Sequence, residues 1–591
     1  MSKLKVAPST AIRWPVPMRG RLTREKPGEL MRSWPKSVSL IAWSMLCLTV
    51  LPRLAVVAAE PAVSVEPPDA IVVCPAMLQP ALKVWLERRT AEGLSVRVVT
   101  PGESAEALRE RLAGLARVGT TRYVLLIGDP RRIVRGQVVG PGAFVPTIYA
   151  QAEATATYQQ TTHLPGDHLY GDFNRDGIID AAVGRLPVRS LPQAREVLSR
   201  IAAYEDSQDF GAWRSRVELV AGLGGFGPLI DGAIETVAAG MITGALPGSV
   251  RTRVTHAGPS SPFCPGPECF TETVLANYAE GSRFWVYAGH GHVCELDRVP
   301  ATAEGRPVLC VEDVARLNRP SESAPIALLL ACYTGAFDAD EDCLATRMLL
   351  APGGPVAVLA GSRVTMPYGN AAAAMALIHA VYEHRPERLG DAWIASLLEM
   401  STSSAARPEL QARRGVIDSL ATLLGGTGID AERREHMQLY NWLGDPTMRM
   451  THPQTIEFTA PARATAGETL LLTGESPLAG TLTIGVHRRL AATPKTLPSQ
   501  NAIRPHAGLA DADDSARRSG EPTTSLPGAR DLYHHANETL LAESRVELLS
   551  PGPWEATILL PQGTTGPVRL VVEIEGLAGH AEGVKQIWVR P

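Results

Sequence analysis

Short apolar runs that alternate with segments of helical spacing are the feature that most constrains how this chain can fold. Three such runs, at residues 70–75, 95–99 and 123–129, are separated by two segments with the apolar spacing of a helix. This β-α-β alternation is typical of a parallel sheet covered by helices. It restarts at residue 217 and continues to residue 400. The sequence therefore predicts an α/β fold with parallel strands, arranged as two sheets or as one long sheet in two halves.

The length of 591 residues is too great for one hydrophobic core, so we expect several domains. We place one α/β subdomain at residues 60–207 and a second at residues 208–450. After residue 450, short strand patterns separated by Gly and Pro turns predict an all-β, immunoglobulin-like sandwich over residues 451–591. A polar stretch at about 490–533 lacks apolar periodicity, and we expect a disordered insertion there.

The first 59 residues have the features of a signal peptide. Residues 37–51 carry no charge, basic residues precede them, and the small-residue segment Val57-Ala58-Ala59 follows. This order is typical of a secretory signal, and the apolar run is short for a membrane span. We expect the true start at Met31 or Met18. The mature protein is then exported to the periplasm, the cell surface or the medium, without a stable membrane span.

The net charge limits the classes of binding partner, and the cysteine count limits the possible disulfide bonds. The net charge of −4 gives no reason to expect nucleic acid or an anionic membrane as a partner. Of eight cysteines, Cys47 lies in the signal region, and the remaining odd number leaves at least one free thiol or an intermolecular bridge. Cys264 and Cys269 lie in a turn-rich segment, and a bridge between them is as well supported as its absence. The sequence does not indicate the oligomeric state.

Two of the apolar runs end in residues that can react together. His290 follows the run at 284–288 and is flanked by glycines, and Cys332 follows the run at 326–331. In open α/β sheets the reactive crevice lies outside the carboxyl ends of the strands. There a histidine can take and return the proton of a thiol nucleophile, and the Gly291 and Cys332 amides can face an oxyanion. Taken singly, a histidine in a tight turn and a buried cysteine are the simpler interpretations.

The chain resembles the gingipain-type cysteine peptidases, a caspase-like group in which a His-Gly and an Ala-Cys end successive strands. The resemblance extends to four other motifs, which are YVLLIGD, DHLYGD with DGIIDAAVGRLPVRS, VAVLAGSRVTMPYGN and NWLGDPTMRM. It implies a secreted cysteine endopeptidase with two caspase-like subdomains and a sandwich after them. Its substrate is a protein or peptide, and the chemistry requires no cofactor. The implied roles are Cys332 as nucleophile, His290 as general base and acid, and Gly291 with Cys332 as oxyanion donors.

The chain departs from this family pattern beside the histidine. The usual His-Gly-Ser reads His290-Gly291-His292, and Leu223 stands where an acidic residue orients the histidine in the gingipains. The third catalytic member is therefore missing or comes from elsewhere. For the pocket that holds the side chain before the cut, Asp231 is the nearest match and Tyr368 is a second candidate. We slightly favour the interpretation of Asp231 as the N-cap of a helix.

A further segment, DFNRDGIID at residues 172–180, spaces oxygen side chains at alternate positions with glycine at the sixth. This resembles the start of an EF-hand calcium loop, in which glycine permits the sharp turn. Val183 stands where such a loop has its bidentate Glu, and the residue at position nine could replace that ligand. The alternative is an Asp- and Asn-rich turn that caps the next strand. Because the resembled family carries structural calcium, we expect calcium at Asp172, Asn174, Asp176 and Asp180.

Two other functions compete with an active peptidase. One is a zinc site at His290, His292, Cys294 and Cys332, which is a weak alternative because paired CxxC spacing is missing. The other is a catalytically weak or inactive pseudoprotease that serves as a cell-surface adhesion or assembly protein. Leu223 and His292 are the residues that favour this second alternative.

Overall fold

The computed structural model describes residues 66–591, apart from residues 103, 135–136, 139–140, 159–161, 224–245, 260, 301–303, 404–407, 424–427 and 491–527. The expected signal peptide at 1–59, with the start at Met31, lies outside the described residues. So do Asp231 and most of the expected insertion. The described residues belong to one compact unit. None of the helices in these ranges is long and apolar enough to span a membrane.

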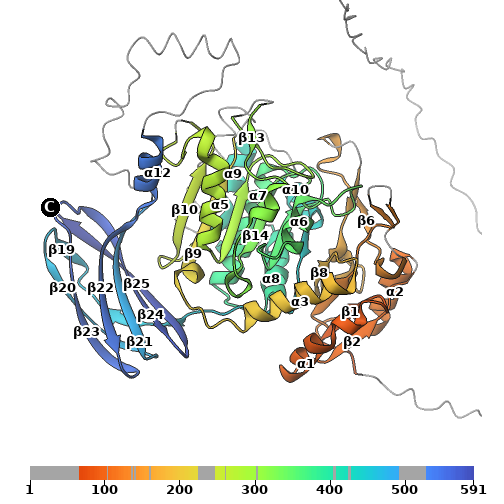
Figure 1. Ribbon diagram of the computed structural model, residues 1–591, viewed down its shortest axis with the longest axis horizontal. Helices are drawn as coiled ribbons and strands as arrows, with labels where there is room; N and C mark the ends of the chain where they lie inside the picture. The colour runs from red at the N-terminus through yellow and green to blue at the C-terminus, as the bar shows by residue number, and fades with distance from the viewer. Residues whose placement is uncertain are drawn as a thin grey trace, which may run out of the picture. The chain divides into compact units, whose positions relative to one another are not determined.

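One ten-stranded sheet runs through the whole α/β region (Figure 1). Its first half contains, in spatial order, β2 (Val96–Val99), β1 (Ala70–Val73), β3 (Tyr123–Ile127), β8 (Ala182–Leu186) and β16 (Tyr440–Leu443). Its second half continues with β15 (Ala357–Gly361), β14 (Ile326–Leu330), β11 (Phe284–Ala288), β9 (Arg216–Ala221) and β10 (Arg251–His256). Strands are parallel within each half, and the halves meet antiparallel where β16 pairs with β15. The two α/β subdomains that we expected therefore share a single sheet.

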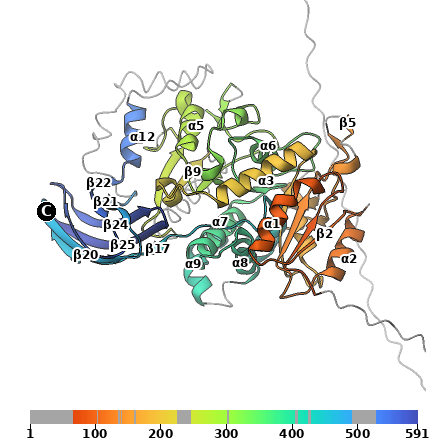
Figure 2. The same ribbon diagram turned by 60° about the horizontal axis from the view of Figure 1, so that its bottom comes forward.

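Helices lie along the sheet, and their boundaries follow local chemistry. Helix α3 (Leu191–Glu205) begins after Ser190, whose hydroxyl accepts the Gln193 N–H, which is the usual N-cap bond. Figure 2 shows α7 (Pro367–Tyr382), α8 and α9 grouped together, apart from α3 and α6. The other helices of the α/β region are α1 (Lys83–Ala91), α2 (Ala105–Leu115), α5 (Phe270–Glu280), α6 (Leu344–Leu350), α8 (Leu389–Ser401), α9 (Pro408–Leu423) and α10 (Ile429–Leu439).

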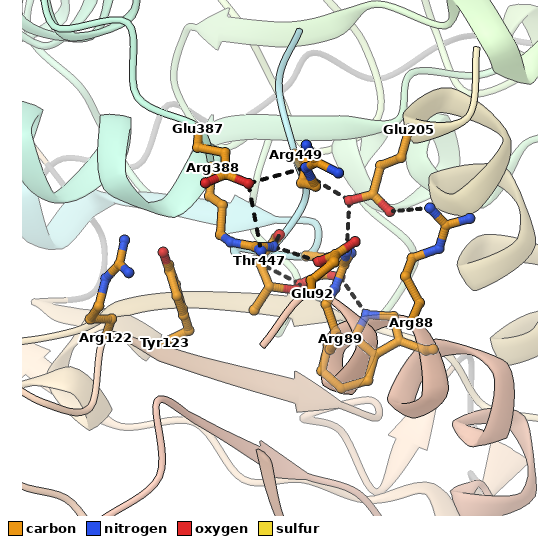
Figure 3. A network of polar contacts seen from close by, with 12 residues as sticks. Arg88, Arg89, Glu92, Arg122, Tyr123, Glu205, Glu387, Arg388, Thr447 and Arg449 are labelled. Carbon is orange, nitrogen blue, oxygen red and sulfur yellow. Dashed lines mark hydrogen bonds and ion pairs between the residues drawn. The ribbon is translucent and has the colours of Figure 1, made fainter. Parts of the chain in front are cut away.

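A buried ionic network ties α1 and α3 to the loop that follows β16 (Figure 3). The fully buried Arg89 of α1 pairs with Glu205 at 2.9 Å and with Asp445 at 3.1 Å. Asp445 also accepts the Trp85 indole N–H at 2.6 Å and the Thr447 amide at 2.8 Å. A buried charge is tolerated only when it is paired and hydrogen-bonded. The NWLGDPTMRM motif therefore fixes the loop after β16 against α1 and α3.

The C-terminal region contains two β-sheets with one shared core. The larger sheet comprises β17 (Gln454–Thr455), β25 (Gly579–Arg590), β24 (Gly566–Gly576), β21 (Gly480–Arg488), β22 (Leu540–Leu548) and β19 (Arg463–Thr465). The smaller comprises β18 (Glu457–Thr459), β20 (Thr469–Ser476) and β23 (Gly552–Leu559). Buried and exposed residues alternate along β23, as expected for a strand with one face on a core. The immunoglobulin-like topology stays a prediction.

The insertion differs from our expectation at its end. We expected disorder up to residue 533, but helix α12 spans Ala529–Asn537. Tyr533 on this helix is buried, and its hydroxyl lies 2.9 Å from that of Thr255 and accepts an N–H from Asn277 at 2.7 Å. These contacts come from β10 and α5, far away in the sequence. A helix as short as this one is marginal in isolation, and these distant contacts stabilise it.

Candidate active site

His290 and Cys332 lie two residues beyond the ends of neighbouring parallel strands. Strands β11 and β14 pair directly, with Ala288 opposite Leu330, so the two segments leave the sheet side by side. They also touch: a Cβ on Gly291 would lie 2.8 Å from the Ala331 Cβ and 2.8 Å from the Cys332 carbonyl oxygen. A real Cβ does not come so close to other atoms. Glycine at this position therefore lets the histidine segment pack against the cysteine turn.

The sulfur of Cys332 rests against the end of a third strand. Thr365, in the loop after β15, donates its N–H to Sγ at 3.3 Å, and its carbonyl oxygen lies 3.5 Å from Sγ. The carbonyl can accept from a thiol, and the amide can donate to a thiolate. The next residue, Tyr333, has a φ of 59°, a left-handed conformation that is uncommon for a residue with a side chain. The turn thus holds the sulfur in one place.

Two amides beside the sulfur are available to a ligand. Within the described ranges, neither the Gly291 N–H nor the Cys332 N–H donates to another residue, whereas their neighbours do. His292 donates to the Glu295 carbonyl at 2.8 Å, and Tyr333 donates to the Arg363 carbonyl at 3.0 Å. Preorganised amides of this kind can accept the charge of an oxyanion. The oxyanion roles of these two amides stay a prediction.

A carboxylate that the sequence reasoning missed lies beside His290. The Asp297 carboxylate accepts the His290 backbone N–H at 3.0 Å and the Tyr287 hydroxyl at 2.9 Å. The same hydroxyl lies 2.9 Å from the His290 carbonyl oxygen and accepts the Asp297 N–H at 3.2 Å. Burial raises the pKa of Asp297, while the His290 amide and the positive charge of the His290 ring oppose the shift. An Asp seven residues after a His gives no recognisable sequence signal.

The position expected for an orienting acid holds Leu223, whose side chain packs on the hydrophobic core. Leu223 follows Gly222, which donates its N–H to the carbonyl of Ala288 at 2.9 Å. A Cβ on Gly222 would lie 1.9 Å from the Asp297 carboxylate. The Asp297 carboxylate thus reaches the backbone directly before the position where the acid is missing.

The second pocket candidate, Tyr368, has its hydroxyl engaged elsewhere. It donates to Asp418 at 2.8 Å and accepts from Arg433 at 3.0 Å, so α7 is tied through it to α9 and α10. These bonds favour a structural role for Tyr368. Asp231, the first pocket candidate, stays a prediction because it lies outside the described residues.

The loop that follows Cys332 is held by the first half of the sheet. Asp342 pairs with Arg131 at 2.8 Å and with Arg189, and both arginines also contact the buried Asp129. Arg131 donates in addition to two carbonyls of the loop, those of residues 339 and 341. His290 and Cys332 follow strands of the second half of the sheet, but residues of the first half position one side of the site.

The other described cysteines, Cys74, Cys264, Cys269, Cys294, Cys310 and Cys343, are free thiols like Cys332, so Cys264 and Cys269 are not bridged. Burial raises the pKa of Cys74 and Cys294 to about 12 and that of Cys310 to about 11. Such thiols are weak nucleophiles at neutral pH because the thiolate is the reactive form. Within the described ranges, no three His, Cys, Asp or Glu side chains are grouped so that they could hold a metal ion.

The segment expected to bind calcium forms a tight turn before β8. Asp176 accepts the Ile178 N–H at 2.8 Å, Asn174 accepts the Asp176 N–H at 3.1 Å, and Gly177 has a φ of 84°. Asp172 pairs with Arg109 through one oxygen at 3.1 Å, and its other oxygen is buried without a hydrogen-bond partner. Burial raises the pKa of Asp180, and the charges of Asp176 and Asp172 add to this shift. The carboxylates thus lie close enough to repel one another.

Comparison with known proteins gives one family and several solved structures. The model for peptidase family C25 matches residues 64–451. The crystal structure of the Arg-specific cysteine proteinase gingipain R is 14% identical, with a TM-score of 0.48, over 90% of this chain and 100% of that chain. The complex of pro- and mature domains of RgpB from Porphyromonas gingivalis is 14% identical, with a TM-score of 0.46, over 88% of this chain and 100% of that chain. None of the curated protein sequences matches the chain significantly.

Proposed function

The chain belongs to peptidase family C25, and from this premise we propose that it is a cysteine endopeptidase that cleaves peptide bonds through Cys332 and His290. The observation that carries the proposal is the packing of the His290-Gly291 segment against Cys332 at the ends of adjacent parallel strands. The amide of Thr365, which donates to the sulfur, supports it further.

The proposed reaction is acyl transfer through a thioester. The Cys332 thiolate attacks the carbonyl carbon, and the Gly291 and Cys332 amides stabilise the oxyanion that forms. The C–N bond then breaks, and the His290 imidazolium gives its proton to the leaving amine. His290 next takes a proton from water, whose oxygen attacks the thioester. The C–S bond breaks, the carboxylic acid leaves, and thiolate and imidazolium are restored.

Replacement of the nucleophile tests this proposal. Cys332→Ala should reduce cleavage of an unfolded protein substrate to the background rate, because it removes the proposed nucleophile. Iodoacetamide should remove activity from the wild-type protein as one thiol equivalent, at Cys332, is alkylated. Cys294→Ala is the matched control and should keep full activity, since burial raises the pKa of Cys294 to about 12.

If the wild-type protein cleaves no member of a broad peptide library, or if Cys332→Ala cleaves as fast as the wild type, the peptidase proposal fails. The side chain of Leu223, which packs on the core where a catalytic acid was expected, would then favour the pseudoprotease alternative. In that case the fold would serve adhesion or assembly, and Cys332 would still react with iodoacetamide without any cleavage.

We also propose that the protein is exported through the signal peptide at residues 1–59 and acts on protein or peptide substrates outside the cytoplasm. Calcium is proposed as a structural ion at Asp172, Asn174, Asp176 and Asp180, whose side chains would have to draw together on binding because the described ones are not grouped around an ion. Two observations support calcium: the carboxylates repel one another, and one buried oxygen of Asp172 has no hydrogen-bond partner. The nearby Arg109 guanidinium would compete with the ion for the negative charge of Asp172. No step of the reaction depends on this ion.

A further inference from the structure

We propose that Asp297 is the positioning residue for His290, and that it takes the place of the acid missing at Leu223. The inference rests on the proposed function, because it assigns a partner to the histidine of that reaction. Asp297 lies between β11 and the β12 strand (Arg298–Val299), on the segment that returns after His290. It is therefore supplied by a different part of the chain from the turn at Leu223.

Asp297 and Tyr287 form a clamp at the main chain of His290. The carboxylate accepts the His290 N–H at 3.0 Å, and the Tyr287 hydroxyl, which donates to that carboxylate at 2.9 Å, also lies 2.9 Å from the His290 carbonyl oxygen. Tyr287 itself is fully buried at 0% exposure, so this clamp is anchored in the core. A carboxylate that holds the His290 N–H restricts the main chain that carries the ring.

Two glycines make room for this carboxylate. A Cβ on Gly222 would lie 1.9 Å from Asp297 Oδ2, and a Cβ on Gly289 would lie 2.7 Å from the same atom. Neither glycine has a positive φ, so backbone conformation does not demand glycine at these two positions. Space for the carboxylate, and for the Tyr287 hydroxyl next to it, is the reason that the geometry gives.

The charge of Asp297 faces the groups that react. The rings of His290 and His292 and the hydroxyl of Tyr287 act on Asp297 electrostatically, and Cys332 acts in turn on Tyr287. A carboxylate next to a histidine stabilises the imidazolium, which in turn stabilises a thiolate. Asp297 thus supplies to His290 the negative charge that Leu223 does not supply.

Two substitutions of Asp297 separate its hydrogen bond to the His290 N–H from its negative charge. Asp297→Asn keeps an acceptor for the His290 N–H and removes the charge, and we expect kcat to fall on the order of tenfold with little change in KM. Asp297→Ala removes both, and kcat should fall on the order of 100-fold. In Asp297→Asn the alkaline limb of kcat/KM should move to lower pH, because an imidazolium without a neighbouring carboxylate loses its proton more readily. A merely structural role would not move this limb.

The matched control is Asp313→Asn, which changes a carboxylate of the same region that pairs with Arg306 and Arg316 at 3.2 Å each. It should leave the pH limb in place. Gly222→Ala should reproduce the loss by displacing the Asp297 carboxylate, and in the Asp297→Asn background it should add no more than the further loss that Asp297→Ala shows over Asp297→Asn. This double-variant cycle stays informative even if Asp297→Ala does not fold.

The outcomes distinguish this inference from the proposed function. If Cys332→Ala abolishes cleavage while Asp297→Asn keeps the wild-type kcat and pH profile, Asp297 does not position His290 and the inference is wrong. If Cys332→Ala keeps full cleavage, the proposed function itself is wrong, whatever the Asp297 variants do. A shifted alkaline limb in Asp297→Asn, with Asp313→Asn unchanged, supports the inference.

Discussion

At the scale of single residues, the close approach of backbone segments at glycines shapes this site more than the number of reactive side chains does. His290 and Cys332 could be predicted from the sequence, because an apolar run followed by a reactive residue marks the end of a buried strand. Asp297 and the main chain of Thr365 could not. Asp297 reaches His290 only because the segment folds back on itself, and a backbone amide has no signature in a sequence. The sequence showed that Leu223 stands where an acidic residue was expected. This raised the question of which residue orients His290, and we propose Asp297 for that role.

Gly291 is the residue whose size matters most directly. Gly291→Ala should lower kcat/KM at least tenfold, because its Cβ would lie 2.7–2.8 Å from Thr334, Ala331 and the Cys332 carbonyl and push the two segments apart. Overpacking of this kind costs about 1–3 kcal/mol of stability. Steady-state kinetics and thermal unfolding of the same sample measure both effects. Gly114→Ala, whose Cβ would meet nothing within 4 Å, is the control: it should leave kcat/KM unchanged and, because Gly114 lies in helix α2, should not lower stability. Unchanged kcat/KM in Gly291→Ala would contradict the close packing described above.

Among the elements, individual strands could be predicted better than their connections. The apolar runs that we assigned to strands correspond to β1, β2, β3, β11 and β14. The sequence left open whether the strands form one sheet or two. The contact that joins β16 to β8 is short, because these strands pair only at Leu443 and Arg185. Helix α12 was missed because it is short and follows a long polar stretch, although Leu532, Tyr533 and Ala536 have the spacing of one apolar helix face.

The loop at residues 172–180 carries a prediction at this scale. Calcium at ten times its dissociation constant should stabilise the protein by about 1.4 kcal/mol, because a ligand that binds only the folded state shifts the unfolding equilibrium. Thermal unfolding with calcium, and with magnesium as the control ion, measures the shift. Asp176→Asn should abolish it, whereas Asp340→Asn, which changes an exposed carboxylate outside the loop, should preserve it. Equal transitions with and without calcium would leave the Asp- and Asn-rich turn as the explanation.

Over the whole molecule, the buried histidines should make stability dependent on pH. Burial lowers the pKa of five histidines to about 3 or 4, namely His168, His436, His452, His487 and His580. With the pKa near 6.5 in the unfolded chain, the unfolded state binds more protons between these values. The contribution of each histidine to stability is therefore complete above pH 6.5 and is lost as the pH falls toward 4 or 3. Glu218, whose pKa burial raises to about 7, acts in the opposite direction.

His487 in the C-terminal sheets gives the sharpest test, since it is 4% exposed and its pKa is lowered to about 3. Between pH 7 and pH 5 it should account for a loss of about 2 kcal/mol in the free energy of unfolding. His487→Leu should reduce the pH dependence by that amount, as measured by urea unfolding at the two pH values. Parallel pH dependences in the two proteins would show that His487 does not stay neutral in the fold.

The place of β16 in the sheet has a consequence for how the chain is made. Strand β8 is finished early in synthesis, yet its neighbour on the side of the second half, Tyr440–Leu443, emerges only after the complete second half has been translated. Until then the hydrogen-bonding edge of β8 is open, and Arg89 lacks Asp445 as its partner. The nascent first half is thus an unfinished sheet with an unpaired edge and an incompletely paired buried charge. Both defects are removed together when one late segment, residues 440–447, docks into the gap.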